Sequence, residues 1–244
     1  MTASIYSEKH KVPFFFTNKN GEMSLSSVLN LGLLVSENQL NSLKLDGNSM
    51  AERGLGWVVT QYHIEVTRMP KVNEEVEIFT QAKSYNKFFC YRDFWIEDEA
   101  GNELVRINSI WVLIDLKERS VIKVTADVVE PLGSVELKGM EKFPRVKKTD
   151  FTDNRREIHI GYYNIDINQH VNNAYYFDWA LDNLDIEFLS QHQIKTVDIK
   201  YENELVYGDT PESFVKIEDG EELTTYHRIQ TEENRNADLK ITWQ

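Results

Sequence analysis

The chain has 244 residues, of which 41% are hydrophobic and 27% charged, and its formal net charge is −13. This acidity argues against nucleic-acid binding, which needs a basic surface, and no stretch approaches the ~20 apolar residues that span a membrane. A single cysteine excludes an intrachain disulfide, and the histidines show no metal-ligand spacing, so we expect neither a metal nor another cofactor. Residues 1–16 lack the layout of a secretory signal, and we therefore expect a cytoplasmic protein.

The first half is predicted to contain one helix followed by antiparallel strands. Residues 24–40 are apolar except for a narrow polar stripe, which predicts a helix largely surrounded by protein. Alternation of apolar and polar residues predicts strands at 56–66, 75–85, 88–98, 104–115 and 120–124. Polar turns at 98–103 and 115–120 leave no room for an intervening helix, so successive strands should pair antiparallel.

The second half repeats this order. A strand at 156–163 and a helix at 172–184 precede strands at 196–206, 213–219, 224–231 and 238–244. A shift of 147 positions lays residues 12–24 over 159–171, which indicates an internal duplication.

These elements predict an α+β fold, a tandem double hotdog with two antiparallel sheets each wrapped around a long central helix. The N-terminal hotdog repeat would span 1–124, a linker without periodicity 125–150, and the C-terminal hotdog repeat 151–244. Another α+β topology remains open, because strand order cannot be read from one sequence. Two repeats in one chain could replace the interface that single hotdogs form by dimerising, so both a monomer and a homodimer fit.

The stretch "NIDINQHVNNAYYFDW" (164–179) gathers short polar side chains before an aromatic helix. In an extended segment, Asp166, Asn168 and His170 would face the same side. Under the shift of 147 the matching residues of the first half are Lys19, Gly21 and Met23. A purely structural cap would be needed in both halves, so the difference favours a function for residues 166–170.

The groups gathered here are suited to acyl transfer to water: amides, a histidine and a carboxylate beside the N-terminus of a predicted helix. Asn172 or Asn173 is a candidate N-cap, which would aim free backbone N–H groups at a developing oxyanion. A thioester is a favourable substrate, because a thiol of pKa near ~8.5 departs as thiolate with little acid help.

Simpler interpretations compete with each of these assignments. Asp166 and Asn168 can be turn formers, His170 a buried histidine, and Asn172 only a cap. Three aromatic residues of the predicted helix fit the core better than a substrate wall: Tyr175, Tyr176 and Trp179.

Two glutamates and the single cysteine are further candidates for an acid and a nucleophile. Glu202 and Glu204 are equally good acids by pattern, because both lie at the end of a predicted strand. Cys90 lies in an apolar strand and is interpreted as a core residue.

The motif D-x-N-x-H-V-N-N at residues 166–173 is similar to that of the acyl-acyl-carrier-protein (ACP) thioesterases of plants and bacteria. Further stretches resemble their counterparts in that family in the same order, so the resemblance covers almost the whole chain: 56–70, 91–98, 109–115 and 197–209. The resemblance implies a tandem hotdog fold and hydrolysis of fatty acyl-ACP to free fatty acid and ACP, which terminates chain elongation.

Carried over position by position, the resemblance implies that four residues are catalytic: Asp166, Asn168, His170 and Glu204. It selects Glu204 over Glu202. Plant members often have a cysteine after this glutamate, where this chain has Leu205, so no cysteine nucleophile is expected at that position.

Two routes to the acid fit this set of residues. Glu204 or Asp166 would take a proton from water, or a carboxylate would attack the thioester directly. His170 would position water, Asn168 and backbone amides would hold the thioester oxygen, and the acyl chain would lie in an apolar cavity between helix and sheet.

The expected partner is an ACP bearing a fatty acyl-phosphopantetheine. ACP is acidic, as this chain is, so docking needs a local basic patch. The candidates are Arg53, Arg68, Lys71, Arg145, Lys147, Lys148 and Arg155. The alternatives are an acyl-CoA thioesterase, a non-catalytic acyl-thioester-binding hotdog protein and, with less support, a hydratase or dehydratase.

Overall fold

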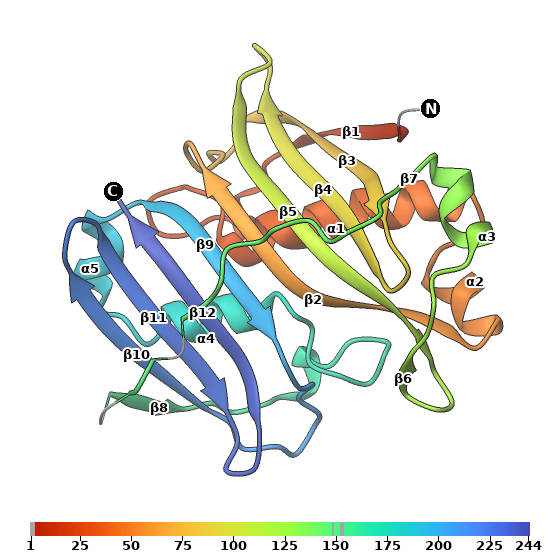
Figure 1. Ribbon diagram of the computed structural model, residues 1–244. Coiled ribbons are helices and arrows are strands. Elements are labelled where there is room, and N and C mark those ends of the chain that lie inside the picture. Colours follow the sequence, from red (N-terminus) through yellow and green to blue (C-terminus); the bar gives the residue numbers. More distant parts are fainter. Residues whose placement is uncertain (1–2, 148, 152–153) are drawn as a thin grey trace.

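The computed structural model describes residues 3–147, 149–151 and 154–244, and its central feature is one large, mostly antiparallel sheet (Figure 1). The strands along the sheet follow the order β1-β3-β4-β5-β2-β9-β12-β11-β10-β8, with β6 paired to β5 and β7 paired to β3. Their bounds are β1 Ile5–Lys11, β2 Leu55–Val66, β3 Glu75–Tyr85, β4 Phe89–Asp98, β5 Glu103–Asp115, β6 Ser120–Val121, β7 Val135–Glu136, β8 Arg155–Glu157, β9 Ile194–Tyr201, β10 Glu212–Asp219, β11 Leu223–Gln230 and β12 Arg235–Trp243. The fold is therefore mixed α+β.

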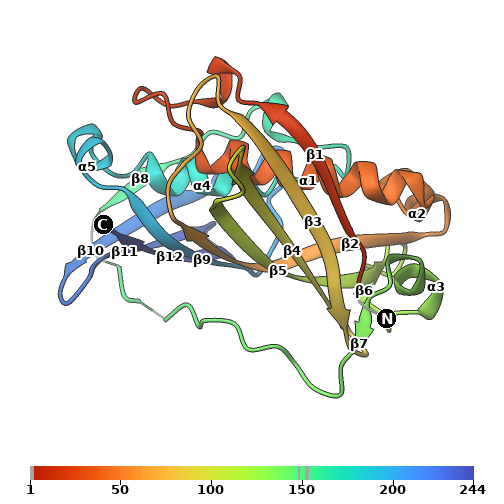
Figure 2. The ribbon, with the colours of Figure 1, turned by 90° about the horizontal axis from the view of Figure 1, so that it is seen from above.

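The helices lie mainly on one face of this sheet. Their bounds are α1 Leu25–Ser42, α2 Gly47–Glu52, α3 Ala126–Val129, α4 Tyr175–Leu181 and α5 Ile186–Gln191, with short 3-10 turns η1 Phe14–Phe16, η2 Glu130–Leu132 and η3 Tyr162–Asn164. Figures 1 and 2 show α1 and α4 on the same face, whereas the segment after β7 crosses the opposite face. None of the helices in the described ranges combines the length and apolar character needed to cross a bilayer.

The two halves of the chain meet at the pairing of β2 with β9. This antiparallel ladder runs from Gln61–Lys200 to Glu65–Thr196 and joins the two predicted sheets into one. Across it, His63 Nδ1 lies 2.6 Å from Asp198 Oδ1, and this hydrogen bond raises the pKa of His63. One core cluster contains side chains from both halves, including Leu29 of α1 and Phe177 of α4. The prediction of two separate sheets is corrected accordingly.

Helix α1 matches the prediction closely and is buried along most of its length. Ser24 caps it by accepting a hydrogen bond from the Ser27 N–H at 3.2 Å. Val28, Leu29 and Val35 are fully buried against the sheet. Alternation also placed β2 to β5 and β10 to β12 to within a few residues, because each presents one face to this core.

The second helix is much shorter than predicted. Instead of 172–184, α4 covers only Tyr175–Leu181, and α5 begins after a break at 182–185. Asp182, Asn183 and Asp185 fall in this break, and Asp and Asn favour turns and caps over helix interiors. The predicted long central helix of the second repeat is therefore wrong.

Two further predictions differ from the structure. The strand expected at 156–163 is reduced to β8, followed by η3, and the strand expected at 196–206 ends at Tyr201. Residues 125–150, predicted as a linker without periodicity, contain α3, η2 and β7, and three of their apolar side chains are buried: Val128, Val129 and Leu132. These short elements lack the full period that a sequence pattern needs.

The loop before each helix has the same hydrogen-bond pattern in both halves. An isolated bridge pairs Thr17 with Met23 in the first half and Ile165 with Val171 in the second. The Asn18 N–H donates to the Glu22 carbonyl at 2.8 Å, and the Asp166 N–H donates to the His170 carbonyl at 2.8 Å. The two loops therefore match at an offset of 148 residues, one more than the shift of 147 inferred from the sequence.

Candidate active site

The loop 166–170 is a tight turn and not an extended segment. The Gln169 N–H donates to the Asp166 carbonyl at 3.1 Å, and Gln169 has a left-handed φ of 69°. Glycine holds the equivalent position in the first half, where Gly21 has φ 73°. The expectation that residues 166, 168 and 170 alternate onto one side of a strand is therefore wrong.

Asp166 and Asn168 contact each other. The Asn168 N–H donates to Asp166 Oδ1 at 2.7 Å, and the Asn168 side-chain amide donates to Asp166 Oδ2 at 3.4 Å. In the first half the Asn20 N–H donates to Asn18 Oδ1 at 2.8 Å in the same way. Because both halves build this Asx turn, it is part of the loop architecture, and the residues matching 166 and 168 are polar in both copies.

His170 and Glu204 form the second pair. His170 Nε2 lies 3.0 Å from Glu204 Oε2, and the two side chains are 20% and 35% exposed. Glu204 lies in the loop after β9, and the Val171 N–H donates to the Leu205 carbonyl at 2.8 Å. This backbone hydrogen bond holds the two loops side by side, so the predicted proximity of these residues is found.

The first half has the same pair of loops but different side chains. There the Met23 N–H donates to the Pro70 carbonyl at 2.8 Å, so Met23 corresponds to Val171 and Pro70 to Leu205. The preceding residues are Glu22 and Met69, where the second half has His170 and Glu204. The acid–imidazole pair is therefore present in one copy only, and this asymmetry replaces the one inferred from the shift of 147.

Arg119 joins the pair from the first half of the chain. It follows β5 in the turn to β6, and its guanidinium forms an ion pair with Glu204 Oε2 and lies 3.4 Å from His170 Nε2. Nε2 cannot donate to Glu204 and accept from Arg119 at once, and the shorter 3.0 Å contact assigns its proton to the bond with Glu204. Sequence reasoning missed Arg119, because 85 residues separate it from Glu204.

The predicted N-cap is also corrected. Ala174 occupies the cap position of α4 without a side-chain hydrogen bond. The Asn172 side chain accepts from the Ala174 N–H at 2.9 Å, and the Asn173 side chain donates to the Tyr62 hydroxyl at 3.2 Å. These asparagines therefore order the segment between the loop and the helix.

The aromatic side chains behind the loop belong to the core, as predicted. Tyr176 is 3% exposed, and Tyr175 and Trp179 pack against the same cluster. Tyr62 and Tyr201 contact each other edge to face, with ring centroids 6.1 Å apart. Burial raises the pKa of Tyr62 and of Tyr201, so both hydroxyls stay protonated. The Tyr201 hydroxyl donates to the Asn173 carbonyl at 2.9 Å, whereas the Tyr62 hydroxyl accepts from the Asn173 side chain.

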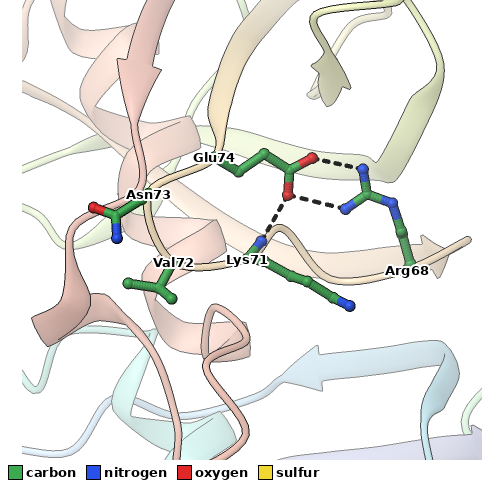
Figure 3. Close-up of a pocket in the computed structure, with 5 residues that line it drawn as sticks. All are labelled: Arg68, Lys71, Val72, Asn73 and Glu74. Carbon is green, nitrogen blue, oxygen red and sulfur yellow. Dashed lines mark hydrogen bonds and ion pairs between the residues drawn. The ribbon is translucent and has the colours of Figure 1, made fainter.

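Buried side chains of the core cluster pack in the space between helices and sheet, where we expected an apolar cavity. A surface hollow of about 500 Å³ lies in the first half, lined by Arg68, Lys71, Val72, Asn73 and Glu74 (Figure 3). Glu74 accepts hydrogen bonds from the Arg68 guanidinium and from the Lys71 backbone N–H at distances from 2.6 to 3.0 Å. Dashed lines mark these contacts in Figure 3. The hollow surrounds the first-half counterpart of the Glu204 loop.

The structure also shows the surroundings of Cys90 and of the basic residues proposed for docking. Burial raises the pKa of the Cys90 thiol to about 12, which agrees with a core role. Arg53, Arg68 and Arg155 form ion pairs with acids, whereas Lys71, Arg145 and Lys147 are exposed, and Lys148 lies outside the described residues. In the described part of the chain, no three His, Cys, Asp or Glu side chains form a metal-binding cluster.

At the surface of this α+β fold, a carboxylate holds an imidazole. Hydrolases that activate water use such a pair. Comparison with known proteins gives the class. A family model described as the acyl-ACP thioesterase N-terminal domain matches residues 3–132, and one described as the C-terminal domain matches residues 147–244. The chain therefore belongs to the acyl-ACP thioesterase family.

Individual relatives agree with this assignment. A chloroplastic oleoyl-acyl carrier protein thioesterase of Coriandrum sativum is 28% identical over 97% of this chain and 71% of its own length. A chloroplastic acyl-[acyl-carrier-protein] hydrolase of Cuphea viscosissima is 28% identical, and the match spans only 51% of that protein. A Lactobacillus plantarum structure, provisionally assigned as an oleoyl thioesterase, has a TM-score of 0.97 and 37% identity, with 99% of this chain and 96% of that one covered.

A more distant structure supports the fold alone. An acyl-ACP thioesterase from Bacteroides thetaiotaomicron superposes with a TM-score of 0.85 at 22% identity, covering 98% of each chain.

Proposed function

We propose that this protein hydrolyses fatty acyl-ACP thioesters to free fatty acid and ACP, and so terminates fatty acid elongation. The observation that carries the proposal is the 3.0 Å contact between His170 and Glu204, in a chain whose two halves both match the acyl-ACP thioesterase family. The fold would be a tandem double hotdog, with repeats at 1–124 and 151–244 joined by 125–150. The reaction would take place in the cytoplasm.

In the proposed mechanism the imidazole is the base. In the described part of the chain, the hydrogen bonds and ion pairs of the His170 ring all involve Nε2, so Nδ1 is the nitrogen that would face a water. Glu204 would hold the ring and stabilise the imidazolium, as a carboxylate does in a catalytic triad. The water oxygen would bond to the thioester carbon, the C–S bond would break, and the proton taken by His170 would pass to the thiolate.

Asp166 and Asn168 would help to stabilise the oxyanion that develops on the thioester. Asp166 fixes the Asn168 backbone and side chain, so the second N–H of that amide would be directed by the turn toward the carbonyl oxygen. Glu204 Oε2 already accepts hydrogen bonds from His170 and Arg119, so a direct attack by this carboxylate would have to come from Oε1. Exposed apolar side chains on the two loops, Ile167 at 82% and Tyr207 at 68%, would contact the pantetheine arm or the acyl chain.

Replacement of His170 tests this function directly. H170A should lower kcat for acyl-ACP by about 10²–10⁴-fold, because proton transfer by a positioned group contributes that much. E204Q should lower kcat as well, because glutamine cannot stabilise an imidazolium. Release of free acid is measured by mass spectrometry across a series of acyl-ACPs of different chain lengths.

The molecule supplies a matched control. Glu22 holds the position of His170 in the first half, so E22A should leave kcat within about twofold of the unchanged protein. A correctly folded H170A protein that hydrolyses acyl-ACP at the full rate would refute the role of the histidine.

The carrier is tested by presenting one acyl chain on two thiols. We expect faster hydrolysis of acyl-ACP than of acyl-CoA at equal concentration. The reverse order would make the protein an acyl-CoA thioesterase, and binding without release of acid would make it an acyl-thioester-binding protein.

A further inference from the structure

Asn236 is a buried amide directly beneath the loop that carries Glu204. It lies on β12 and is 1% exposed. Its side-chain N–H groups donate to two successive carbonyls of that loop, those of Asn203 and Glu204, each at 3.3 Å. Its side-chain oxygen accepts from the Thr231 N–H at 3.1 Å, so both ends of the amide are used.

The backbone of Asn236 also holds this loop. Its carbonyl accepts hydrogen bonds from the N–H groups of Glu202 at 2.9 Å and Asn203 at 3.4 Å. On the other side, the Val171 N–H donates to the Leu205 carbonyl at 2.8 Å. The main chain around Glu204 is thus fixed from β12 and from the His170 loop together.

The first half shows what the same position looks like without a catalytic loop. There the Leu104 carbonyl accepts from the N–H groups of Thr67 at 2.9 Å and Arg68 at 3.3 Å. Strand register agrees, because Val66 pairs with Val105 as Tyr201 pairs with Ala237. Leu104, 2% exposed, is therefore the counterpart of Asn236.

This comparison separates the fold from the site. A buried leucine suffices where the loop carries Met69, so the fold itself does not require an amide at this position. A buried amide costs free energy unless it is hydrogen-bonded, and Asn236 directs its bonds to the loop of Glu204. We propose that Asn236 is a positioning residue that holds Glu204 in contact with His170, an inference that rests on the proposed function.

Asn236→Leu tests this inference, because the variant copies the first half. N236L removes the donors to the two carbonyls, and Glu204 should then lose its contact with His170. A misplacement of about 1 Å can cost up to about 10²-fold in rate, so kcat should fall about 10–100-fold while KM for acyl-ACP stays within twofold. The reciprocal control, L104N, should change neither constant.

Two further readouts distinguish positioning from general loss of structure. In an E204Q background, N236L should lower kcat no further, because the group that it positions is already gone. The crystal structure of N236L should show the Glu204 carboxylate beyond hydrogen-bonding distance of His170. N236A serves in the same tests if leucine prevents folding.

The inference and the proposed function fail in different ways. Absence of acid release by the unchanged protein would refute the function alone, while the crystal structure of N236L would still test the geometry. Unchanged kcat in folded N236L, additive losses with E204Q, or an intact contact between Glu204 and His170 in N236L would overturn the role of Asn236.

Discussion

His170 and Asp166 lie four residues apart in one loop, yet their surroundings differ in kind. Asp166 makes a turn that Asn18 makes equally well in the first half. His170 meets Glu204, and no such pair exists at the matching positions Glu22 and Met69. At the scale of single residues, the imidazole and the glutamate therefore carry the difference between the two halves.

Arg119 is the third charged group beside the His170–Glu204 pair, and its contribution to kcat should be modest. Its side chain is 59% exposed, and exposed ion pairs are worth about 0–1 kcal/mol. R119A should therefore lower kcat by less than about tenfold, and R119K should recover part of the loss. Steady-state rates at low and high salt check this, because screening should shrink the difference between R119A and the unchanged protein.

A loss of several hundredfold in R119A would contradict this expectation and would place the guanidinium among the groups that stabilise the reacting atoms.

The site residues were only partly predictable from the sequence. The spacing around His170 identified the loop, but its assumed extended shape was wrong because Gln169 adopts a left-handed conformation. Pattern alone left Glu202 and Glu204 equivalent, and only the family resemblance chose between them. Arg119 and Asn236 reach the site through strand pairing across the sheet, which no local pattern encodes.

At the scale of elements, the packing of α4 against α1 places an acid where it is partly buried. Burial raises the pKa of Asp178 on α4 to about 6, opposed by a hydrogen bond from Ser26 of α1 and assisted by the nearby charge of Asp182. The folded protein therefore holds the Asp178 proton more tightly than the unfolded chain, whose pKa is near ~3.9. This contribution to stability is full below that value and is lost as pH rises through about 6.

D178N should consequently stabilise the protein at pH 8 by about 1–3 kcal/mol, since each unit of pKa shift corresponds to ~1.4 kcal/mol. Near pH 4 the variant and the unchanged protein should be almost equally stable. Urea unfolding of both proteins at the two pH values gives the difference, and D182N is the comparison for a neighbouring acid on the same stretch. An equal effect of D178N at both pH values would show that the carboxyl does not titrate in this range.

Helices and strands were predictable from the sequence where the element is long and buries one face. Strands such as β3 and β5 alternate over eleven and thirteen residues, and their bounds followed from the sequence. Helix α4 has only seven residues, and the aromatic run 175–179 continues the apolar pattern past the point where Asp182 and Asn183 end the helix. Short elements such as β7 and β8 have two and three residues, too few to show a period.

At the scale of the whole molecule, the chain contains two copies of the loop pair, but only the second-half copy carries the His170–Glu204 pair. Arg119 of the first half contacts this pair, so the site depends on how the two halves join through β2 and β9. A monomer thus contains every residue of the proposed site. The first-half loop pair, with its hollow at Arg68 and Glu74, provides an internal reference against which each catalytic assignment can be tested.

Charge on the whole molecule bears on how an acidic carrier would dock. The net charge of −13 opposes ACP, so docking should use cations close to the site. The structure favours the segment around the β5–β6 turn, where Arg119 touches Glu204 and where Lys117 and Lys123 are exposed. Of the cations expected from the sequence, Lys71 lies instead beside the first-half hollow, where it lines the pocket.

K117E should therefore raise KM for acyl-ACP by about 3–10-fold with little change in kcat, because a charge at the rim acts on encounter more than on chemistry. A neutral N-acetylcysteamine thioester of the same acyl chain should be hydrolysed equally by K117E and the unchanged protein. K71E, which makes the same change beside the first-half hollow, should leave KM for acyl-ACP within twofold. If K71E raised KM and K117E did not, the carrier would approach from the first half, and the β5–β6 turn would have no part in docking.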